Sequence, residues 1–444
     1  MLKRIVVLAI LLPNIFFGQH TIKGTFSPAE DFNIALLYKV TPTTSDYITN
    51  AEIKDGILEL KLDSTATKGM YRIVYAIPQE DYNFDVIYNG KENIKLKFNT
   101  ETGVEFQSSS ENKLLASYTN SMSTITHSIG NFYREESKDS LALIDIFKTQ
   151  SEAQTSFEDL AKETIALQFI KANKPYIPEA FEDVQTYIDN LKTHYFDFVD
   201  FNNETLQSSN FFQERMLNYV FGMSSKEEDE TTNYKNNIDV FYKAMEVASN
   251  DTKRYLLFDL WQQMGDLGFE DVANYISETY LIDVAKALND NELIEGLTLF
   301  KNISTGSKAP DFSFEIEKDS KINTTKLSEI DIAETCVLVF WSSTCGHCLD
   351  EIPQLQTFIK TQEAGKLKVI AVALEEEPYK WKDLTYDFPE FIHVYGEGKW
   401  DNKIGNSYGV TATPTYFILN KDKEIIAKPE NIEALKTFFE EPEN

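Results

Sequence analysis

The chain has 444 residues, of which 42% are hydrophobic and 13% aromatic, and it carries a formal net charge of −29. This length corresponds to about three domains of about 150 residues each, and the composition is that of a globular protein and not of a disordered one. Such an acidic surface repels nucleic acids and anionic lipids, so neither is expected as a partner.

The first 18 residues have the features of a cleaved export signal. Lys3 and Arg4 precede an apolar core at residues 5–12, and Gly18 is a small residue near the expected cleavage point. This apolar core is too short to cross a bilayer, which takes about 20 residues; a buried N-terminal strand is the alternative. Because no cysteine lies near the cleavage point, lipid attachment is not expected. We predict that residues 1–18 are removed and that the protein occupies the periplasm or another extracytoplasmic part of the cell envelope.

Residues 19–107 have the pattern of a β-rich domain. Leu58, Leu60 and Leu62 alternate with polar residues directly after an Asp55-Gly56 turn. Period-two alternation between turn residues is typical of half-buried antiparallel strands. We expect a small sandwich or open barrel.

The pattern changes to helical from about residue 108. Tyr118, Met122, Ile125 and Ile129 recur at steps of three and four, which places them on one face of an amphipathic helix. Similar spacing continues to about residue 300, which predicts a middle α-helical domain without a catalytic cluster.

Residues 301–444 alternate apolar strands with helices, which favours an α/β domain with a central, partly parallel sheet. The stretch 375–390 is expected to be a longer loop. The predicted strands are 335–341, 367–374, 411–419 and 424–427, with helices opening near residue 345 and running over 430–439.

Cysteine use points to redox chemistry in this last region. The chain has three cysteines, Cys336, Cys345 and Cys348, and none in the preceding 335 residues. Cys345 is expected at the start of a helix, where free N–H groups and the helix dipole favour a thiolate and therefore a nucleophile. Cys348 lies three residues later, where it can resolve a mixed disulfide. The predicted reaction is thiol–disulfide exchange without a cofactor.

A zinc site and a purely structural disulfide are two other interpretations of the cysteine pair, and both fit the sequence less well than a redox pair does. Zinc needs four ligands, usually two such pairs, and no second pair exists, so no metal is expected. A purely structural disulfide would close a very short loop and add little stability. Cys336 lies within an apolar strand and is expected to be a buried packing residue.

Residues from about 305 to 444 resemble the thioredoxin superfamily, and within it the TlpA/ResA-like envelope thiol–disulfide oxidoreductases. The upstream domains resemble, without any sharp motif, the N-terminal extension of larger envelope relatives. The predicted fold is therefore multidomain: an N-terminal antiparallel β domain, a middle α-helical domain and a C-terminal α/β thioredoxin-like fold. The motifs that carry the resemblance are APDF (309–312), FWSSTCGHC (340–348), EIP (351–353) and VTATPTYFIL (410–419).

The resemblance implies further site residues. Thr413 and Pro414 would form a cis-proline loop that faces the two sulfurs and holds the substrate chain. Glu351 would keep up the pKa of the cysteines and assist proton transfer; the alternative is a solvated glutamate on the helix surface. Trp341 would pack beneath the site, and we group it with the substrate-binding residues.

Three positions bear on the direction of electron flow and on proton transfer. His347 gives the CGHC sequence of protein disulfide isomerases, and a partly protonated imidazole beside Cys345 would favour the reduced form and a more oxidising couple. Thr344 stands where thioredoxin has tryptophan, and Val339 replaces a buried acid of the thioredoxin pattern. Loss of that acid removes the usual proton acceptor for the second cysteine.

The predicted function is an exported thiol–disulfide oxidoreductase that reduces protein disulfides. A disulfide oxidase or isomerase, and a non-catalytic envelope binding or scaffold module, are the alternatives. Expected partners are protein or small-molecule disulfides and a membrane thiol–disulfide electron donor, with no nucleic acid; a homodimer is left open.

Overall fold

The computed structural model describes residues 20–41, 45–79, 81–224, 228–318, 321–331 and 333–440. The predicted export signal, residues 1–18, lies outside these residues. The chain forms two compact units that divide between Leu256 and Leu257, within helix α8 (Asn250–Asp266).

The first unit begins with a β-sandwich. Each of its two sheets has four strands, and side chains from both, such as Leu58 and Ile73, share one core. The predicted alternation is seen in β4, where Leu58, Leu60 and Leu62 are buried and the residues between them exposed. All strand pairs recorded in the two sheets are antiparallel except β1 with β7. One sheet has the order β4 (Ile57–Leu62), β1 (His20–Ser27), β7 (Ile94–Asn99), β8 (Gly103–Phe106), and the other β3 (Ser45–Glu52), β2 (Ile34–Val40), β5 (Gly69–Val74), β6 (Asn83–Tyr88).

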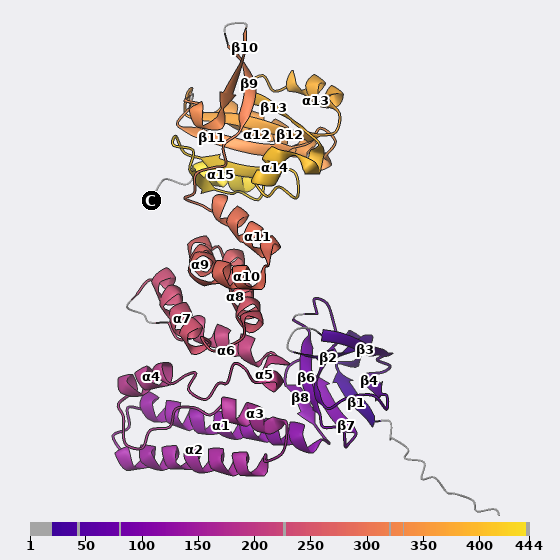
Figure 1. Cartoon of the computed structure of the whole chain (residues 1–444), viewed down its shortest axis with the longest axis vertical. Coiled ribbons are helices and arrows are strands. Elements are labelled where there is room, and N and C mark those ends of the chain that lie inside the picture. Colours follow the sequence, from indigo (N-terminus) through magenta and orange to yellow (C-terminus); the bar gives the residue numbers. More distant parts are fainter. Residues whose placement is uncertain are drawn as a thin grey trace, which may run out of the picture. The chain divides into compact units, whose positions relative to one another are not determined.

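Helices follow the sandwich (Figure 1). The longest, α1 (Ser110–Arg134), buries Tyr118, Met122 and Ile129, as its helical spacing predicts. It packs against α2 (Ser140–Leu160), which begins at an Asp139 cap whose side chain accepts from Ala142 N–H. The others are α3 (Ala166–Ala172), α4 (Val184–Thr193), α5 (Glu204–Gln207), α6 (Phe211–Val220) and α7 (Glu230–Ala244).

The second unit contains the end of α8, three helices that follow it and the C-terminal α/β domain, which has helices of its own. Glu270 at the start of α9 accepts a hydrogen bond from Thr305 N–H and pairs with Lys428, which fastens these helices to the sheet domain. The domain boundaries near residues 18, 107 and 300 remain predictions. The helices are α9 (Glu270–Ile276), α10 (Ile282–Leu288) and α11 (Asn291–Asn302), with a π-helical turn at Ser277–Leu281.

The C-terminal sheet has five strands in the order β13-β12-β11-β14-β15. Strands β11, β12 and β13 are parallel, whereas β14 and β15 run antiparallel to their neighbours. Apolar side chains cover both faces of this sheet. Helices α12 and α15 pack on one of the two faces. The elements are β9 (Ser313–Lys318), β10 (Lys321–Lys326), β11 (Thr335–Trp341), α12 (Gly346–Lys360), β12 (Leu367–Glu375), β13 (Ile392–Glu397), α14 (Lys403–Ser407), β14 (Thr415–Leu419), β15 (Ile425–Ala427) and α15 (Ile432–Glu440).

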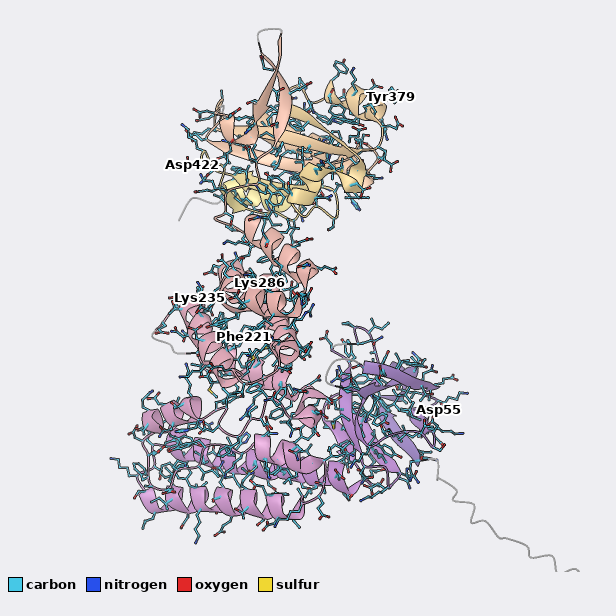
Figure 2. The ribbon with its side chains drawn as sticks, viewed as in Figure 1. Asp55, Phe221, Lys235, Lys286, Tyr379 and Asp422 are labelled. Carbon is cyan, nitrogen blue, oxygen red and sulfur yellow. The ribbon has the colours of Figure 1, made fainter. Side chains whose placement is uncertain are left out.

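Two local predictions were wrong. The stretch 375–390 is not simply a loop, because helix α13 (Pro378–Thr385) begins there with a proline at its first position, where the missing N–H costs nothing. Tyr379 projects from this helix and is 76% exposed (Figure 2). Strand β14 begins at Thr415 and not at residue 411, because Pro414 cannot donate to a strand ladder. The predicted fold class is confirmed: a β domain, a helical region and a thioredoxin-like α/β domain.

Candidate active site

The two cysteines lie where the central strand of the C-terminal sheet passes into a helix. Strand β11 ends at the fully buried Trp341, and a short turn leads to Cys345, the N-cap of α12. Cys345 Sγ accepts a hydrogen bond from the backbone N–H of Cys348 at 3.3 Å. The sulfur thus takes the place of the oxygen that normally caps a helix and satisfies one of its free N–H groups.

The two thiols differ in exposure and acidity. Cys345 is partly exposed, whereas Cys348 is completely buried. Burial by itself would raise the pKa of Cys345, but hydrogen bonds with the Cys348 thiol and the N–H groups of Cys348 and His347 outweigh it and lower this pKa. Burial, reinforced by the hydrogen bond with Cys345, raises the pKa of Cys348 to about 12. The exposed thiol is therefore the better nucleophile, and the buried one is held protonated.

The loop that precedes β14 reaches the exposed sulfur. The peptide bond between Thr413 and Pro414 is cis, and the Cys345 thiol donates to the carbonyl oxygen of Thr413 at 3.2 Å. Thr413 and Pro414 are both partly exposed. The structure therefore brings together three of the predicted site residues: Cys345, Thr413 and Pro414.

Glu351 is anchored within the protein and is not a freely solvated surface residue. Its Oε2 atom accepts hydrogen bonds from the Tyr416 hydroxyl at 3.0 Å and from the Ile432 N–H, at the start of α15, at 2.9 Å. Tyr416 is buried, and its pKa is raised by burial, by Glu351 and by the nearby Cys348 and Cys345. Tyr416 thus binds the carboxylate and lies close enough to the cysteines to interact with them electrostatically. Sequence reasoning missed it, although its position two residues after Pro414 was a usable signal.

The remaining predicted residues lie at different depths. His347 is exposed beside the cysteines. Trp341 is fully buried in the same apolar cluster as Cys348, so it supports the site from below and offers no surface to a substrate. Its assignment as a substrate-binding residue was therefore wrong. Cys336 is buried in the cluster on the opposite face of the sheet, and burial raises its pKa.

A buried carboxylate does lie under the site, but on a different strand from the one considered in the sequence. Val339, the position of the missing acid, is fully buried among apolar side chains. Glu375 at the end of β12 is 3% exposed, and its Oε1 accepts from the backbone N–H of Ser343 at 2.5 Å. It therefore holds the turn between β11 and Cys345. The signal in the sequence was a charge at the end of a run of apolar strand residues.

Among the residues that the structure describes, no three His, Cys, Asp or Glu side chains are placed to hold a metal ion together. The site consists of two thiols, a cis-proline loop and an anchored glutamate.

Comparisons with known proteins match this region. Residues 304–436 fit the Redoxin family. The sporulation thiol–disulfide oxidoreductase A of Bacillus subtilis is 31% identical over 117 residues, which cover 24% of this chain and 66% of that protein, slightly less than two thirds of its length.

Two solved structures are also similar. A domain of a possible thiol–disulfide isomerase from Cytophaga hutchinsonii is 28% identical and covers 30% of this chain and 90% of its own, with a TM-score of 0.26. A thioredoxin-like protein from Bacteroides caccae is 18% identical and covers 60% of this chain and 96% of its own, with a TM-score of 0.31. The family match and the curated relative bear out the resemblance seen in the sequence: residues 304–436 match the Redoxin family and are similar to a thiol–disulfide oxidoreductase.

Proposed function

We propose that the protein is an exported thiol–disulfide oxidoreductase that reduces protein disulfides through Cys345 and Cys348. The observation that carries this proposal is the contrast between the two thiols: a partly exposed Cys345 with a lowered pKa at a helix N-terminus, beside a buried Cys348 with a raised pKa. A cysteine pair with a purely structural role does not require its two thiols to differ in exposure and pKa. A nucleophilic thiol and a resolving thiol do require this difference.

The exchange proceeds in two steps. The Cys345 thiolate attacks one sulfur of a substrate disulfide, forms a mixed disulfide and releases the other substrate sulfur as a thiolate. Cys348 then loses its proton and attacks Cys345 Sγ, which releases the second substrate thiolate and leaves a Cys345–Cys348 disulfide. Two electrons pass from the protein to the substrate, and an external dithiol must return them.

Resolution requires the buried Cys348 thiol to lose a proton. Part of its raised pKa comes from Cys345, and that contribution disappears once Cys345 is bound in a mixed disulfide. We propose that Glu351 assists this deprotonation and that Tyr416, which binds Glu351 and lies close to both cysteines, couples the carboxylate to them.

Thr413 and Pro414 are proposed to hold the substrate beside the nucleophile. In the dithiol state the carbonyl oxygen of Thr413 is occupied by the Cys345 thiol. When Cys345 is a thiolate or a mixed disulfide, that donor is lost and the carbonyl is free to accept an N–H from an extended substrate chain.

We propose that the protein lies in the periplasm or another extracytoplasmic compartment. Support comes from the signal-like residues 1–18 and from the avoidance of cysteine outside the last 110 residues or so. Within the described part of the chain, no helix is long and apolar enough to cross a membrane. The electron donor is proposed to be a membrane thiol–disulfide protein, and homodimerisation is left open.

An oxidase or isomerase is the second candidate, because one observation favours it. A lowered pKa of Cys345 stabilises the thiolate and hence the reduced protein, which makes the couple more oxidising. A partly protonated His347 would act in the same direction.

Trapping of mixed disulfides tests the proposal. Cys348→Ser, incubated with insulin as a disulfide substrate, should accumulate a covalent adduct that dithiothreitol releases. Cys345→Ser should accumulate none, since the two remaining thiols, Cys336 and Cys348, are buried and have raised pKa values. If neither variant forms an adduct, the redox proposal fails and a binding module takes its place.

A further inference from the structure

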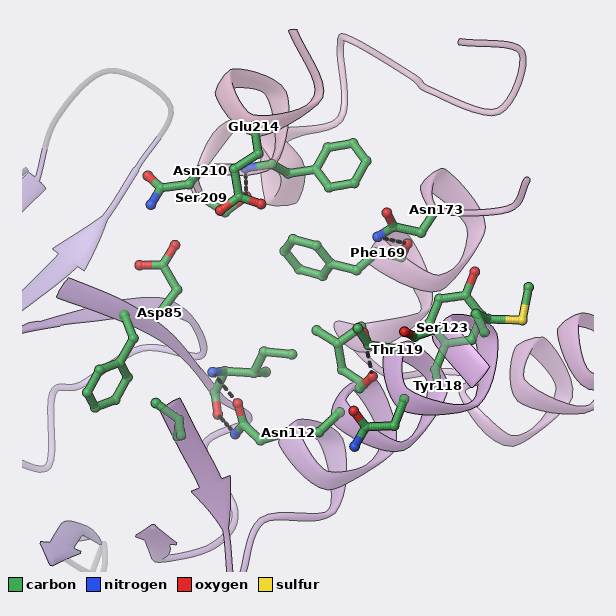
Figure 3. Close-up of a pocket in the computed structure, with 18 of the residues that line it drawn as sticks. Asp85, Asn112, Tyr118, Thr119, Ser123, Phe169, Asn173, Ser209, Asn210 and Glu214 are labelled. Atoms are coloured by element: carbon green, nitrogen blue, oxygen red, sulfur yellow. Dashed lines mark hydrogen bonds between the residues drawn. The ribbon is translucent and has the colours of Figure 1, made fainter. Parts of the chain in front are cut away.

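Helices α9 and α11 contact the redox domain, and their residues do not belong to the large cavity of the first unit. That cavity, of about 840 Å³, is lined by residues between Met70 and Asn218 (Figure 3). Residues of α9 and α11 instead reach the two loops that complete the redox site, the one before Pro414 and the one before α15. These contacts connect the two helices with the surroundings of the thiols.

The chain between α11 and the redox domain is paired with the last strand of the sheet. Gly306 N–H donates to Ile425 C=O at 2.7 Å, and Ile425 N–H donates to Ser307 C=O at 2.9 Å. Ala309 N–H donates to Lys423 C=O at 2.9 Å. These backbone hydrogen bonds cover the outer edge of β15 and fix the chain that follows α11 to the sheet.

Lys428 follows β15 directly and is held by both helices. Its ammonium group pairs with Glu270 of α9 and lies 5.8 Å from the centre of the Phe300 ring of α11. The side chains of Lys428 and Glu270 are only 28% and 16% exposed. Solvent screens such a pair weakly, and removal of one partner leaves a charge without compensation. Glu270 also accepts from Thr305 N–H at 2.7 Å, which restricts its carboxylate.

A short, stiff segment leads from Lys428 to the carboxylate of the redox site. Pro429 has a restricted φ, and the Asn431 side chain caps α15 by accepting a backbone N–H of its first turn at 3.0 Å. The residue after this cap is Ile432, whose N–H donates to Glu351 at 2.9 Å. A displacement of Lys428 is therefore passed over a few residues to a group that orients Glu351.

The second loop of the site also rests on this part of the chain. A Cβ placed on Gly409 would lie 3.4 Å from Ile303 Cδ1, just beyond the end of α11, and 3.5 Å from Leu299 Cδ2 within it. Gly409 has a φ of +62°, which glycine adopts without strain. It stands shortly before Thr413, whose carbonyl oxygen accepts from the Cys345 thiol. The end of α11 thus supports the chain that leads into the cis-proline.

We propose that Lys428 is a positioning residue of the redox site. Held by Glu270, it fixes the segment that presents the Ile432 N–H to Glu351. The carboxylate is thereby placed to assist the deprotonation of Cys348. Helices α9 and α11 are then part of the working redox unit and not only a connection between domains. The inference rests on the proposed redox function, because it gives Lys428 a role in the second step of that exchange.

The two steps of the exchange can be measured separately with dithionitrobenzoate, a small aromatic disulfide. The Cys345 thiolate attacks this disulfide, forms a mixed disulfide and releases one thionitrobenzoate; Cys348 loses its proton, attacks Cys345 Sγ and releases the second. The reduced full chain is mixed with an equimolar amount of the disulfide, and stopped-flow absorbance gives a rate for each release. A positioning role of Lys428 affects the second release and not the first.

Lys428→Met should slow the second release by about tenfold or more and leave the first within about twofold of wild type, because a displaced group loses much of its contribution to proton transfer. Glu270→Gln keeps an acceptor for Thr305 N–H but loses the charge, so it should slow the same step. The double variant should be no slower than the slower single variant, since both substitutions remove one contact. Lys286→Met is the control, because Lys286 pairs with Asp283 on α10 and both side chains are exposed.

An epistasis measurement tests whether Lys428 acts through Glu351. In a Glu351→Gln background, which lacks the carboxylate, Lys428→Met should slow the second release no further. If Lys428→Met slows that background as much as it slows the wild type, the residue does not act through Glu351 and the proposal is wrong. Urea denaturation shows whether each variant is folded, and Glu270→Gln alone decides if Lys428→Met is not.

The proposal is overturned if Lys428→Met and Glu270→Gln release the second thionitrobenzoate as fast as the wild type. Equal slowing of both releases also overturns it, because a general loosening of the domain would have that effect. In both cases the wild type still completes the exchange, so the proposed function stands. If the wild type itself releases no second thionitrobenzoate, the redox function fails, and the role of Lys428 fails with it.

Discussion

The carboxylate of Glu351 accepts a hydrogen bond of 3.0 Å from the hydroxyl of Tyr416, which ties the helix that carries both cysteines to the strand that follows the cis-proline. The same carboxylate oxygen accepts from Ile432 N–H, so it also holds the last helix. A single acidic residue thus connects three elements around the thiols.

Removing the Tyr416 hydroxyl should weaken this connection. Tyr416→Phe deletes one of the two donors to Glu351, and hydrogen bonds to charged groups contribute about 1.5–3 kcal/mol. We expect a loss of about 1–2 kcal/mol in the free energy of unfolding, measured by urea denaturation. An unchanged free energy would show that the contact contributes nothing to stability.

Glu351→Gln tests whether the carboxylate acts on the thiols. The amide keeps an acceptor for Tyr416 but loses the charge, so the titration of Cys348 should shift when followed by alkylation and mass spectrometry. Asp350→Asn removes an equal charge from an exposed neighbouring position and should leave the titration unchanged. If the titrations of both thiols in Glu351→Gln match the wild type, Glu351 has no part in proton transfer.

The two thiols should differ in their pH dependence toward iodoacetamide. Because hydrogen bonds lower the pKa of Cys345, its alkylation in the reduced protein should be half-maximal below about 8.5, the value of a free cysteine. Cys348, with a pKa of about 12, should stay unmodified until far higher pH or until the protein unfolds. Equal reactivity of the two thiols near neutral pH would contradict the assignment of nucleophile and resolving thiol.

The buried Glu375 should stabilise the turn before Cys345. Glu375→Ala leaves the Ser343 N–H without its acceptor, which should cost about 1–3 kcal/mol of unfolding free energy. Glu375→Gln can still accept that hydrogen bond and should cost less than the alanine substitution. Glu376→Ala, at the exposed next residue, should stay within about 0.5 kcal/mol of wild type. An alanine variant as stable as this control would exclude the proposed anchoring.

Trp341 should report the redox state of the pair by its fluorescence. Its indole is fully buried in the cluster that contains Cys348, so a change between thiol and disulfide alters its surroundings. Trp341→Phe should abolish the difference in emission between the oxidised and reduced protein. Trp400→Phe, at a 46% exposed position, should preserve it. A redox signal that survives Trp341→Phe would place the reporter elsewhere.

Much of the redox site could be predicted from the sequence because its determinants are local. The spacing of Cys345 and Cys348 and the apolar strand before them are contiguous patterns with a direct structural meaning, whereas the role of Thr413 and Pro414 was implied only by the resemblance to the thioredoxin superfamily. The alternating and helical periods likewise predicted the sandwich and the long helices, since burial on one face imposes those periods.

The features that sequence reasoning missed depend on contacts across the fold. Glu375 reaches the turn before Cys345 from the neighbouring strand β12, and Tyr416 reaches Glu351 from β14. The sequence marks both positions, but it does not tell which groups they contact. The position of Trp341 beside the motif suggests a role in substrate binding, but it does not tell which way the side chain points. The sequence of helix α13 resembles a turn because acidic residues and a proline stand at its start, although proline at a first helical position is favourable.

The midpoint potential of the Cys345–Cys348 couple tests the central claim most directly. The protein, with residues 19–444, would be equilibrated in glutathione buffers and its thiols counted by alkylation, with His347→Ala measured in parallel. The account predicts a potential near that of thioredoxin, about −270 mV, and a shift of less than about 30 mV on removal of the exposed imidazole. A potential near that of protein disulfide isomerase, about −180 mV, or a pair that does not cycle between thiol and disulfide, would contradict a reductase.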